Sequence, residues 1–404
     1  MARLRRPAAL ATAALILLGL SLPAAAKTVD KYVPVAPLVL PSSIQGVGSI
    51  AADADGNVYV GYNCCPAGTT WVAVFDRAGS FLRKWQVDDT AQALRPEIAV
   101  GVDGLVYVAP GMTGGAPIRV FKPDGTPVGE LGVGVDIALP SDLEVDRAGN
   151  VYTTSRAGGT VKDDTIIRFD RAGKVTGRFA PLPGHPGALD NAIAGIAVAP
   201  DGSIYATMEL GNANVADSFL LVHLNASGRN LRDAPPLAKI IENTIAEDVD
   251  FVGGRLYVAG RSSASRHGLF AFTPKGTDVA KIAGCCGHDV AVSGADVWVT
   301  GLEPSERRIR HVKRQQAPSL TALPAPVKRG GTITFAGSGF RPNASVSLHL
   351  GSASGKTFAA ARTGAAGAFR LGYRIGPSWR PGSVTVVACQ SGCSVKATAA
   401  IRVM

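Results

Sequence analysis

The sequence predicts an all-β protein in which a six-bladed β-propeller, residues 27–314, is followed by an immunoglobulin-like β-sandwich, residues 317–404. Two observations lead to this prediction. A short hairpin pattern occurs six times before residue 317, at intervals of 41 to 53 residues. The remaining 88 residues form seven short alternating segments that contain no Asp or Glu. Repetition at such an interval is typical of propeller blades.

The repeated pattern is clearest in IAADADGNVYV, Ile50 to Val60. An apolar segment, a tight Asp-Gly turn and a β-branched, aromatic segment together predict a β-hairpin. The further copies are IAVGVDGLVYV, LEVDRAGNVYT, IAVAPDGSIYA, VDFVGGRLYVA and VAVSGADVWVT. The second segment of each copy contains one aromatic residue, which we call its aromatic anchor: Tyr59, Tyr107, Tyr152, Tyr205, Tyr257 and Trp298.

A second turn pattern follows the first in most copies: VFDRAG, VFKPDG, RFDRAG, HLNASG and AFTPKG. It predicts a third strand, a hairpin turn and a fourth strand. Four strands in each of six repeats, with no helical periodicity between them, predict a six-bladed propeller. The DADGN segment, Asp53 to Asn57, lacks the downstream Glu of a calcium loop, and we interpret it as a turn.

The repeats resemble those of NHL and SMP-30 type propellers, whose blades follow G-I-A-V-D-x-D-G-N-V-Y-V. The resemblance covers about Ile44 to Arg314. It implies the fold, but no single activity, because such propellers include lactonases, lyases, scaffolds and receptors.

The first 26 residues have the organisation of a secretory signal peptide. Three arginines precede the apolar run Ala8 to Leu20, and Ala24 to Ala26 follow it. This order predicts cleavage before Lys27. The apolar run is short for a membrane span. We therefore expect a secreted protein, extracellular or periplasmic and associated with the cell surface.

The sixth repeat contains only three predicted strands. Within residues 27–43, the segment Tyr32 to Leu40 is β-capable but interrupted by proline, which edge strands tolerate. We expect it to supply the missing outer strand and close the ring. A disordered lead-in is the alternative.

A position just before each first strand is expected to face the mouth of the central channel. Acids occupy four of the six copies, Glu97, Asp142, Asp248 and Asp289, and the other two hold Ser49 and Gly195. The SMP-30 resemblance implies a divalent cation at such positions, here calcium, with Asn191 as a further ligand. The alternative is that the carboxylates accept main-chain N–H bonds and pin each blade to the next.

Three histidines, His185, His267 and His288, are predicted on the same face. Three imidazoles are a ligand set for zinc. In six-bladed amidating lyases, however, the three histidines occupy matching blade positions, and here only His288 does. Surface and loop positions are therefore the favoured interpretation. The sequence contains no nucleophile elbow, H-E-x-x-H motif, P-loop or dinucleotide fingerprint.

Six cysteines in an exported chain predict disulfides. Cys64 and Cys65 lie in a loop of the first repeat, and Cys285 and Cys286 precede the sixth. Disulfides between these pairs would join the first repeat to the sixth, at the seam where the ring closes. Two vicinal disulfides, or a redox or metal role, are the alternatives.

The C-terminal segment FAGSGFRPNASVSL, Phe335 to Leu348, resembles the G-x-G-F-x-P signature of IPT-type and neocarzinostatin-type domains. Both belong among immunoglobulin-like sandwiches. The resemblance to the second type implies a hairpin disulfide between Cys389 and Cys393.

Charge is unevenly distributed along the chain. Residues 317–404 contain ten Lys and Arg and no acid, whereas residues 27–316 carry a net charge of −3. We expect the basic sandwich to bind an anionic surface polymer or polysaccharide. Solvation and protection of strand edges are the alternative. The arginines expected to project outward are Arg362, Arg370, Arg374 and Arg402.

Together these features favour an exported, non-enzymatic binding protein. Its propeller loops would recognise a ligand or a protein, and its basic sandwich would attach to an anionic surface. The alternative is a metal-dependent hydrolase or lyase of the lactonase type that uses the acidic ring.

Overall fold

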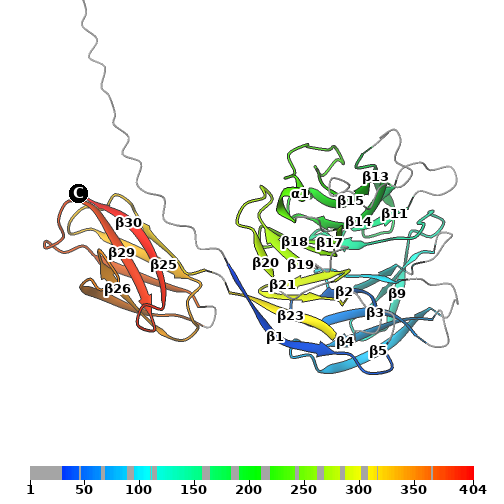
Figure 1. The fold of residues 1–404 in the computed structure, drawn as a ribbon, viewed down its shortest axis with the longest axis horizontal. Coiled ribbons are helices and arrows are strands. Elements are labelled where there is room, and N and C mark those ends of the chain that lie inside the picture. Colours follow the sequence, from blue (N-terminus) through cyan, green and yellow to red (C-terminus); the bar gives the residue numbers. More distant parts are fainter. Residues whose placement is uncertain are drawn as a thin grey trace, which may run out of the picture. The chain divides into compact units, whose positions relative to one another are not determined.

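The fold is known from a computed structural model, which divides into two compact units, residues 29–316 and 317–404 (Figure 1). It describes residues 30–44, 47–64, 69–88, 95–109, 111, 116–156, 164–182, 191–210, 219–241, 245–261, 268–282, 287–301, 308–315, 317–364 and 367–404. Residues 1–29, the predicted signal peptide included, lie outside this range. In the described part of the chain, no helix has the length and apolar character needed to cross a membrane.

The first unit contains six antiparallel sheets among its described residues. The first three sheets follow the chain in order: β2 (Val47–Ala52), β3 (Val58–Cys64), β4 (Thr69–Phe75), β5 (Phe81–Asp88); β6 (Glu97–Val100), β7 (Val106–Ala109), β8 (Ile118–Phe121), β9 (Pro127–Leu131); and β10 (Leu143–Val145), β11 (Val151–Ser155), β12 (Thr165–Phe169), β13 (Val175–Phe179).

The other three sheets are β14 (Asn191–Val198), β15 (Ile204–Leu210), β16 (Phe219–Leu224); β17 (Ile245–Val252), β18 (Arg255–Arg261), β19 (Gly268–Phe272), β20 (Ala280–Ile282); and β21 (Val290–Ser293), β22 (Asp296–Val299), β23 (Arg308–Gln315), with β1 (Lys31–Val39) as the outer strand.

These sheets form a closed ring. Their first strands contact one another in the order β2, β6, β10, β14, β17, β21 and back to β2. A separate hydrophobic core lies between each pair of neighbouring sheets. All six aromatic anchors of the repeats are buried in these cores. A ring of radially packed antiparallel sheets is a β-propeller.

Hydrogen bonds within the turn explain why Asp, Asn and Tyr recur at the same spacing inside the repeats. Asp53 accepts hydrogen bonds from Asn57 N at 2.8 Å, Asn57 Nδ2 at 2.8 Å and the Tyr59 hydroxyl at 3.3 Å. The third sheet repeats this arrangement with Asp146, Asn150 and Tyr152. Gly56 has a φ of 86°, which glycine adopts at the lowest cost. DADGN is therefore a hairpin turn.

The fourth sheet differs from the predicted four strands. Among its described residues it has three strands, and Leu224 pairs with Asn230 only as an isolated bridge. The following segment contains Pro235 and Pro236, which lack the N–H that a continuing ladder needs. A short helix, α1 (Leu237–Ile240), follows instead and packs against β16.

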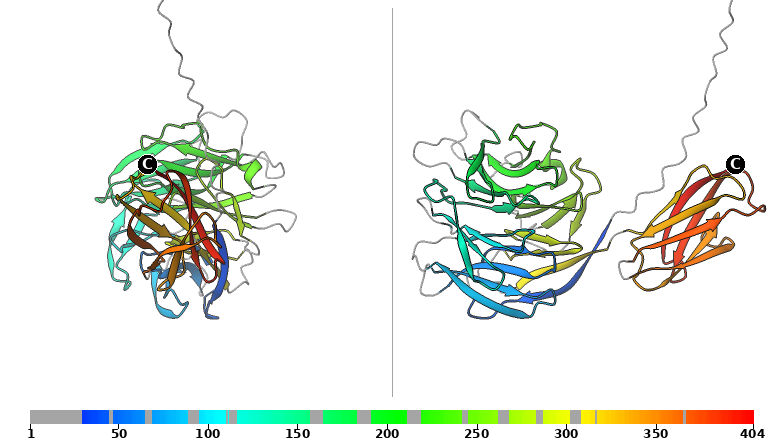
Figure 2. Two further views of the ribbon diagram at one scale, coloured as in Figure 1. Left: turned by 90° about the vertical axis from the view of Figure 1, so that its left-hand side faces the viewer. Right: turned by 180° about the vertical axis from the view of Figure 1, so that it is seen from behind.

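The seam of the ring lies between the sixth and first sheets. There β1 pairs antiparallel with β23, the outer position at which residues 32–40 were expected (Figures 1 and 2). Leu38 and Leu40 are buried in the core shared with the first sheet. Arg77 of the first sheet also forms an ion pair with the buried Asp296 of the sixth. Apolar contacts and charge therefore both hold the seam closed.

The second unit contains two sheets that pack around one core. One sheet has the order β24 (Ser319–Leu323), β25 (Thr332–Ser338), β28 (Phe369–Arg374), and the other β27 (Thr357–Arg362), β26 (Ser345–Leu350), β29 (Gly382–Gln390), β30 (Val395–Val403). Strands β27 and β28 meet at one side of this sandwich, and β24 and β30 meet at the other. A disulfide joins Cys389 to Cys393.

Candidate functional site

A cavity of about 470 Å³ lies where the loops preceding the first strands of the propeller meet. All four acids predicted to face the channel mouth contribute to its wall: Glu97, Asp142, Asp248 and Asp289. Asp142, Asp248 and Asp289 also line a second cavity of about 130 Å³, together with Glu144 and Asp250. The predicted acids are therefore brought together, and three of them separate an outer cavity from an inner one.

The aspartates bind the main chain of the next sheet along the ring. Asp142 Oδ2 accepts from Ile196 N at 2.5 Å, and Asp248 Oδ2 accepts from Val290 N at 2.9 Å. Asp289 Oδ2 accepts from Ile50 N at 2.7 Å and so connects the sixth sheet to the first. The sequence offered two roles for these acids, hydrogen bonding to the main chain of the next blade and binding of a metal. The structure shows the hydrogen bonds of the first role. These bonds join the first strands of neighbouring sheets.

Two serine hydroxyls and Asp250 also form hydrogen bonds to the main chain of a neighbouring sheet. The Ser49 hydroxyl donates to Pro96 O at 3.0 Å, and the Ser141 hydroxyl donates to Ile193 O at 2.6 Å. One layer below, Asp250 Oδ2 accepts from Val292 N at 2.9 Å. The channel wall is thus lined by side chains that satisfy main-chain groups of neighbouring sheets.

Gly195 explains why the fourth sheet has no acid at the matching position. A Cβ atom at residue 195 would lie 2.5 Å from Asp248 Oδ1 and 2.7 Å from Asp248 Cα. Atoms of a real side chain do not approach this closely without displacing their neighbours. The glycine therefore leaves room for the carboxylate of Asp248 from the next sheet.

The channel acids are protonated more readily than ordinary carboxyl groups. Burial, followed by repulsion from Asp248, raises the pKa of Glu97, Asp142 and Asp289 well above its usual range. The same two causes raise the pKa of Asp250 to about 7. Burial and repulsion from Asp248 therefore let the folded protein hold these protons to a higher pH than the unfolded chain does.

The four acids alone, as they are arranged here, do not form the calcium site that the resemblance implies. Ca²⁺ ligands lie about 2.3–2.6 Å from the ion, so their oxygens must lie within about 5 Å of one another. Among the described residues, no three of the four acids place one oxygen each within 4.8 Å of one another. Each aspartate also uses one oxygen on a main-chain N–H. The side chain of Asn191 lies outside the described residues.

The outer cavity contains charged residues that the repeat pattern did not identify. Arg95, Arg156, Glu209 and Glu247 line it beside the acidic ring. His288 also lines it, with its Nδ1 atom 3.3 Å from Glu247 Oε2. Arg95 and Glu247 lie within two residues of the predicted positions Glu97 and Asp248. This closeness in the sequence could have identified them as cavity residues. Arg156 directly follows the second strand β11, and Glu209 lies near the end of the second strand β15.

Several predicted residues cannot be placed. His185 and His267 lie outside the described residues, so the zinc alternative stays an untested prediction. The same holds for the seam disulfide, because Cys65, Cys285 and Cys286 lie outside the described residues and only the main chain of Cys64 is described.

The four predicted arginines are all exposed, but they lie on two sides of the sandwich. Arg362 lies on β27, whereas Arg370 and Arg374 lie on β28, the edge strand that β27 contacts. Arg402 lies on β30 at the opposite side. The structure therefore places three of them on two edge strands that contact each other, and the fourth on an edge strand at the opposite side.

No family model matches this chain, and no curated protein does. Solved structures that resemble it include a gluconolactonase from Xanthomonas campestris, with a TM-score of 0.48, 14% identity, and coverage of 72% of this chain and 99% of that one. A luciferin-regenerating enzyme has a TM-score of 0.46, 14% identity, and coverage of 69% and 95%. A WD40 domain from Neurospora crassa has a TM-score of 0.44, 12% identity, and coverage of 71% and 96%. At these values the assignment of the fold rests on the ring of sheets.

The raised pKa values predict how stability depends on pH. Asp250 binds a proton in the folded state up to about pH 7, whereas an ordinary Asp releases it near pH 3.8. The folded state therefore holds more protons in this window, and the free energy of unfolding falls as pH rises through it. We expect Asp250→Asn, which keeps an acceptor for Val292 N, to raise Tm at pH 8 by roughly 4 °C.

This increase should disappear at pH 4, where Asp250 is protonated. Asp55→Asn removes the same charge from an exposed turn and should leave Tm within about 1 °C at both pH values. Thermal unfolding measured by circular dichroism at pH 4 and pH 8 tests this expectation. An equal effect of Asp250→Asn at both pH values would contradict it.

Proposed function

We propose that the protein is an exported, non-enzymatic binding protein, a complete six-bladed propeller joined to an immunoglobulin-like sandwich. The sandwich attaches the protein to an anionic polysaccharide or related surface polymer. The outer cavity of the propeller and its surrounding loops recognise a ligand or a protein. One observation supports this attachment most directly: all ten Lys and Arg of the sandwich are exposed, and the sandwich contains no Asp or Glu.

Charge without internal compensation supports polyanion binding. Each of the ten cations is exposed, and the sandwich contains no carboxylate side chain that would neutralise them. Arg362 lies on β27, and Arg370 and Arg374 lie on β28, the edge strand that β27 contacts. Several exposed cations on neighbouring strands suit a ligand with repeated anionic groups.

The binding role is favoured over the metal-dependent enzyme by the acids of the channel. Each of its three aspartates uses an oxygen on a main-chain N–H of the next sheet, and no three of the four described acids place one oxygen each within 4.8 Å of one another. The outer cavity nevertheless is lined by basic residues, Arg95 and Arg156, and by acidic residues outside the ring, Glu209 and Glu247. Such a mixed lining supports recognition of a polar ligand.

Retention of the full chain on immobilised heparin tests the attachment. We expect the protein to bind at low salt and to elute as salt rises, because polyanion binding releases counterions. The triple variant Arg362→Glu, Arg370→Glu, Arg374→Glu should elute at much lower salt, with an affinity at least tenfold weaker. The single variant Arg402→Glu, on the other side, should have a smaller effect.

A matched variant separates local binding from net charge. Arg147, Arg178 and Arg229 are exposed arginines of the propeller, and their replacement by Glu changes the net charge by the same amount. This variant should elute close to the wild type. If both triple variants elute together, or if the wild type is not retained at low salt, attachment through the sandwich is wrong.

A further inference from the structure

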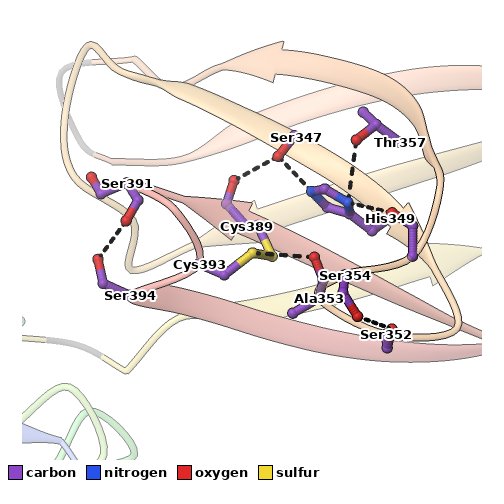
Figure 3. Close-up of a disulfide and its surroundings, with 11 residues drawn as sticks. Ser347, His349, Ser352, Ala353, Ser354, Thr357, Cys389, Ser391, Cys393 and Ser394 are labelled. Carbon is purple, nitrogen blue, oxygen red and sulfur yellow. Dashed lines mark hydrogen bonds between the residues drawn. A yellow bond between two sulfur atoms is a disulfide. The ribbon is translucent and has the colours of Figure 1, made fainter.

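We propose that the hairpin disulfide of the sandwich is the oxidised form of a metal site, and that reduction creates a Cys₂His site for a thiophilic ion such as Zn²⁺. Cys389, Cys393 and His349 each place one potential ligand atom so that all three lie within 4.8 Å of one another. Figure 3 shows the imidazole of His349, from β26, beside the disulfide of the β29 hairpin.

The distances need only a small adjustment. Ligand atoms bound to one tetrahedral zinc at about 2.0–2.3 Å lie roughly 3.3–3.8 Å apart. A spread of at most 4.8 Å therefore needs movements of about 1 Å. The chain separates His349 from Cys389 by 40 residues, but β26 and β29 are paired, with Ser347 opposite Cys389. The site is thus built on two neighbouring strands of one sheet.

The hydrogen bonds of His349 prepare one ring nitrogen as a ligand. Gly355 O lies 2.9 Å from Nδ1, and a carbonyl can only accept, so Nδ1 carries the proton. Nε2 then carries the lone pair and lies 2.8 Å from the Ser347 hydroxyl, which also lies 3.3 Å from Cys389 O. Metal-binding histidines commonly donate their other N–H to a main-chain carbonyl in this way. Nε2 is therefore the nitrogen that would bind the metal.

The turn that carries Cys393 favours movement once the disulfide opens. Ser391, Gly392 and Cys393 have φ values of 51°, 64° and 63°. Only glycine adopts this left-handed region without a steric cost. The disulfide ties this turn to β29, so breaking it lets the Cys393 sulfur approach the imidazole. Ala353 O, 3.6 Å from this sulfur, is an acceptor for the resulting thiol.

The chemistry requires a reductant, for which we take a dithiol. The dithiol supplies two electrons and two protons: the S–S bond breaks, two S–H bonds form, and the reductant closes its own disulfide. Binding of Zn²⁺ then displaces both thiol protons, and the two thiolates balance the charge of the ion. Lys396, opposite Cys389 on β30, adds a positive charge that favours thiolates.

The test measures binding of Co²⁺ to the full chain, because tetrahedral thiolate coordination gives Co²⁺ strong visible and near-ultraviolet absorption. Wild type and the Cys389→Ser, Cys393→Ser variant are titrated with and without prior reduction by a dithiol, which is then removed without air. The other four cysteines are common to both proteins. We expect reduced wild type to bind one more equivalent than the reduced variant, and the two to bind equally without reduction.

His349→Gln distinguishes a three-ligand site from a dithiol alone. We expect this variant to bind the additional Co²⁺ at least tenfold more weakly and with an altered absorption spectrum. The matched change His288→Gln, in the propeller, should leave that equivalent unchanged. Equal stoichiometry in reduced wild type and the double cysteine variant would overturn the proposal. So would an affinity and a spectrum unaffected by His349→Gln.

Discussion

Deletion of residues 30–41 is expected to lower the Tm of the propeller by about 10 °C or more and to make the protein aggregate. The deleted strand contributes Leu38 and Leu40, which are only 2% and 4% exposed. Each buried leucine stabilises a protein by about 3 kcal/mol relative to alanine. Loss of β1 also leaves the outer edge of β23 unpaired, and an unpaired strand edge promotes association between molecules.

Two neighbouring residues of β1 provide a milder version of the same experiment. Leu38→Ala should cost about 3 kcal/mol, because it leaves a cavity in the seam. Val39→Ala should cost less than about 0.5 kcal/mol, because Val39 is 61% exposed. Denaturant unfolding measures both values, and light scattering measures the association of the deletion. A monomeric deletion with unchanged Tm would show that β1 does not close the ring.

Gly195→Ala is the second substitution for which a large loss of stability is expected. The added methyl group would meet Asp248 Oδ1 at 2.5 Å, Asp248 Cα at 2.7 Å and Val249 N at 3.0 Å. Two of these three atoms belong to the main chain, so rotation of a side chain cannot relieve the contact. We expect the free energy of unfolding to fall by about 3 kcal/mol, at the upper end of the usual cost of overpacking.

The control for this substitution is Gly129→Ala, in β9. A Cβ atom at residue 129 would meet no atom within 4 Å. Because glycine weakens a strand through its backbone entropy, alanine there should be neutral or slightly stabilising. Denaturant unfolding of both variants makes the comparison. Equal effects would mean that the close packing of the fourth and fifth sheets around Asp248 is not what requires glycine.

Much of the fold could be predicted because it is encoded over short distances along the chain. The pattern of Asp53, Asn57 and Tyr59 forms a turn within seven residues, and its repetition locates the hairpins. The alternation of Phe369, Leu371 and Tyr373 with exposed residues likewise marks β28. Local conformational preference and the two-residue period of a strand are visible in a single sequence.

The sequence also located the candidate site, but it left the role of the acids open. The spacing placed Asp142, Asp248 and Asp289 at equivalent points of the ring, and the structure brings them around one channel. Their hydrogen-bond partners are 54, 42 and 239 residues away. A carboxylate that pins a neighbouring sheet and one that binds a metal differ only in such distant partners.

The sequence by itself determined the repeated hairpins, the strands of the sandwich and the concentration of positive charge after residue 316, because each depends on residue type and short-range order. Only the tertiary structure decided that the strand of Arg362 contacts the strand of Arg370 and Arg374, while Arg402 lies on the edge strand at the opposite side, since this depends on the order of strands in the two sheets. It also brought His349 to the disulfide through the pairing of β26 with β29. Contacts between strands far apart in the chain are fixed by packing, and no periodic pattern records them.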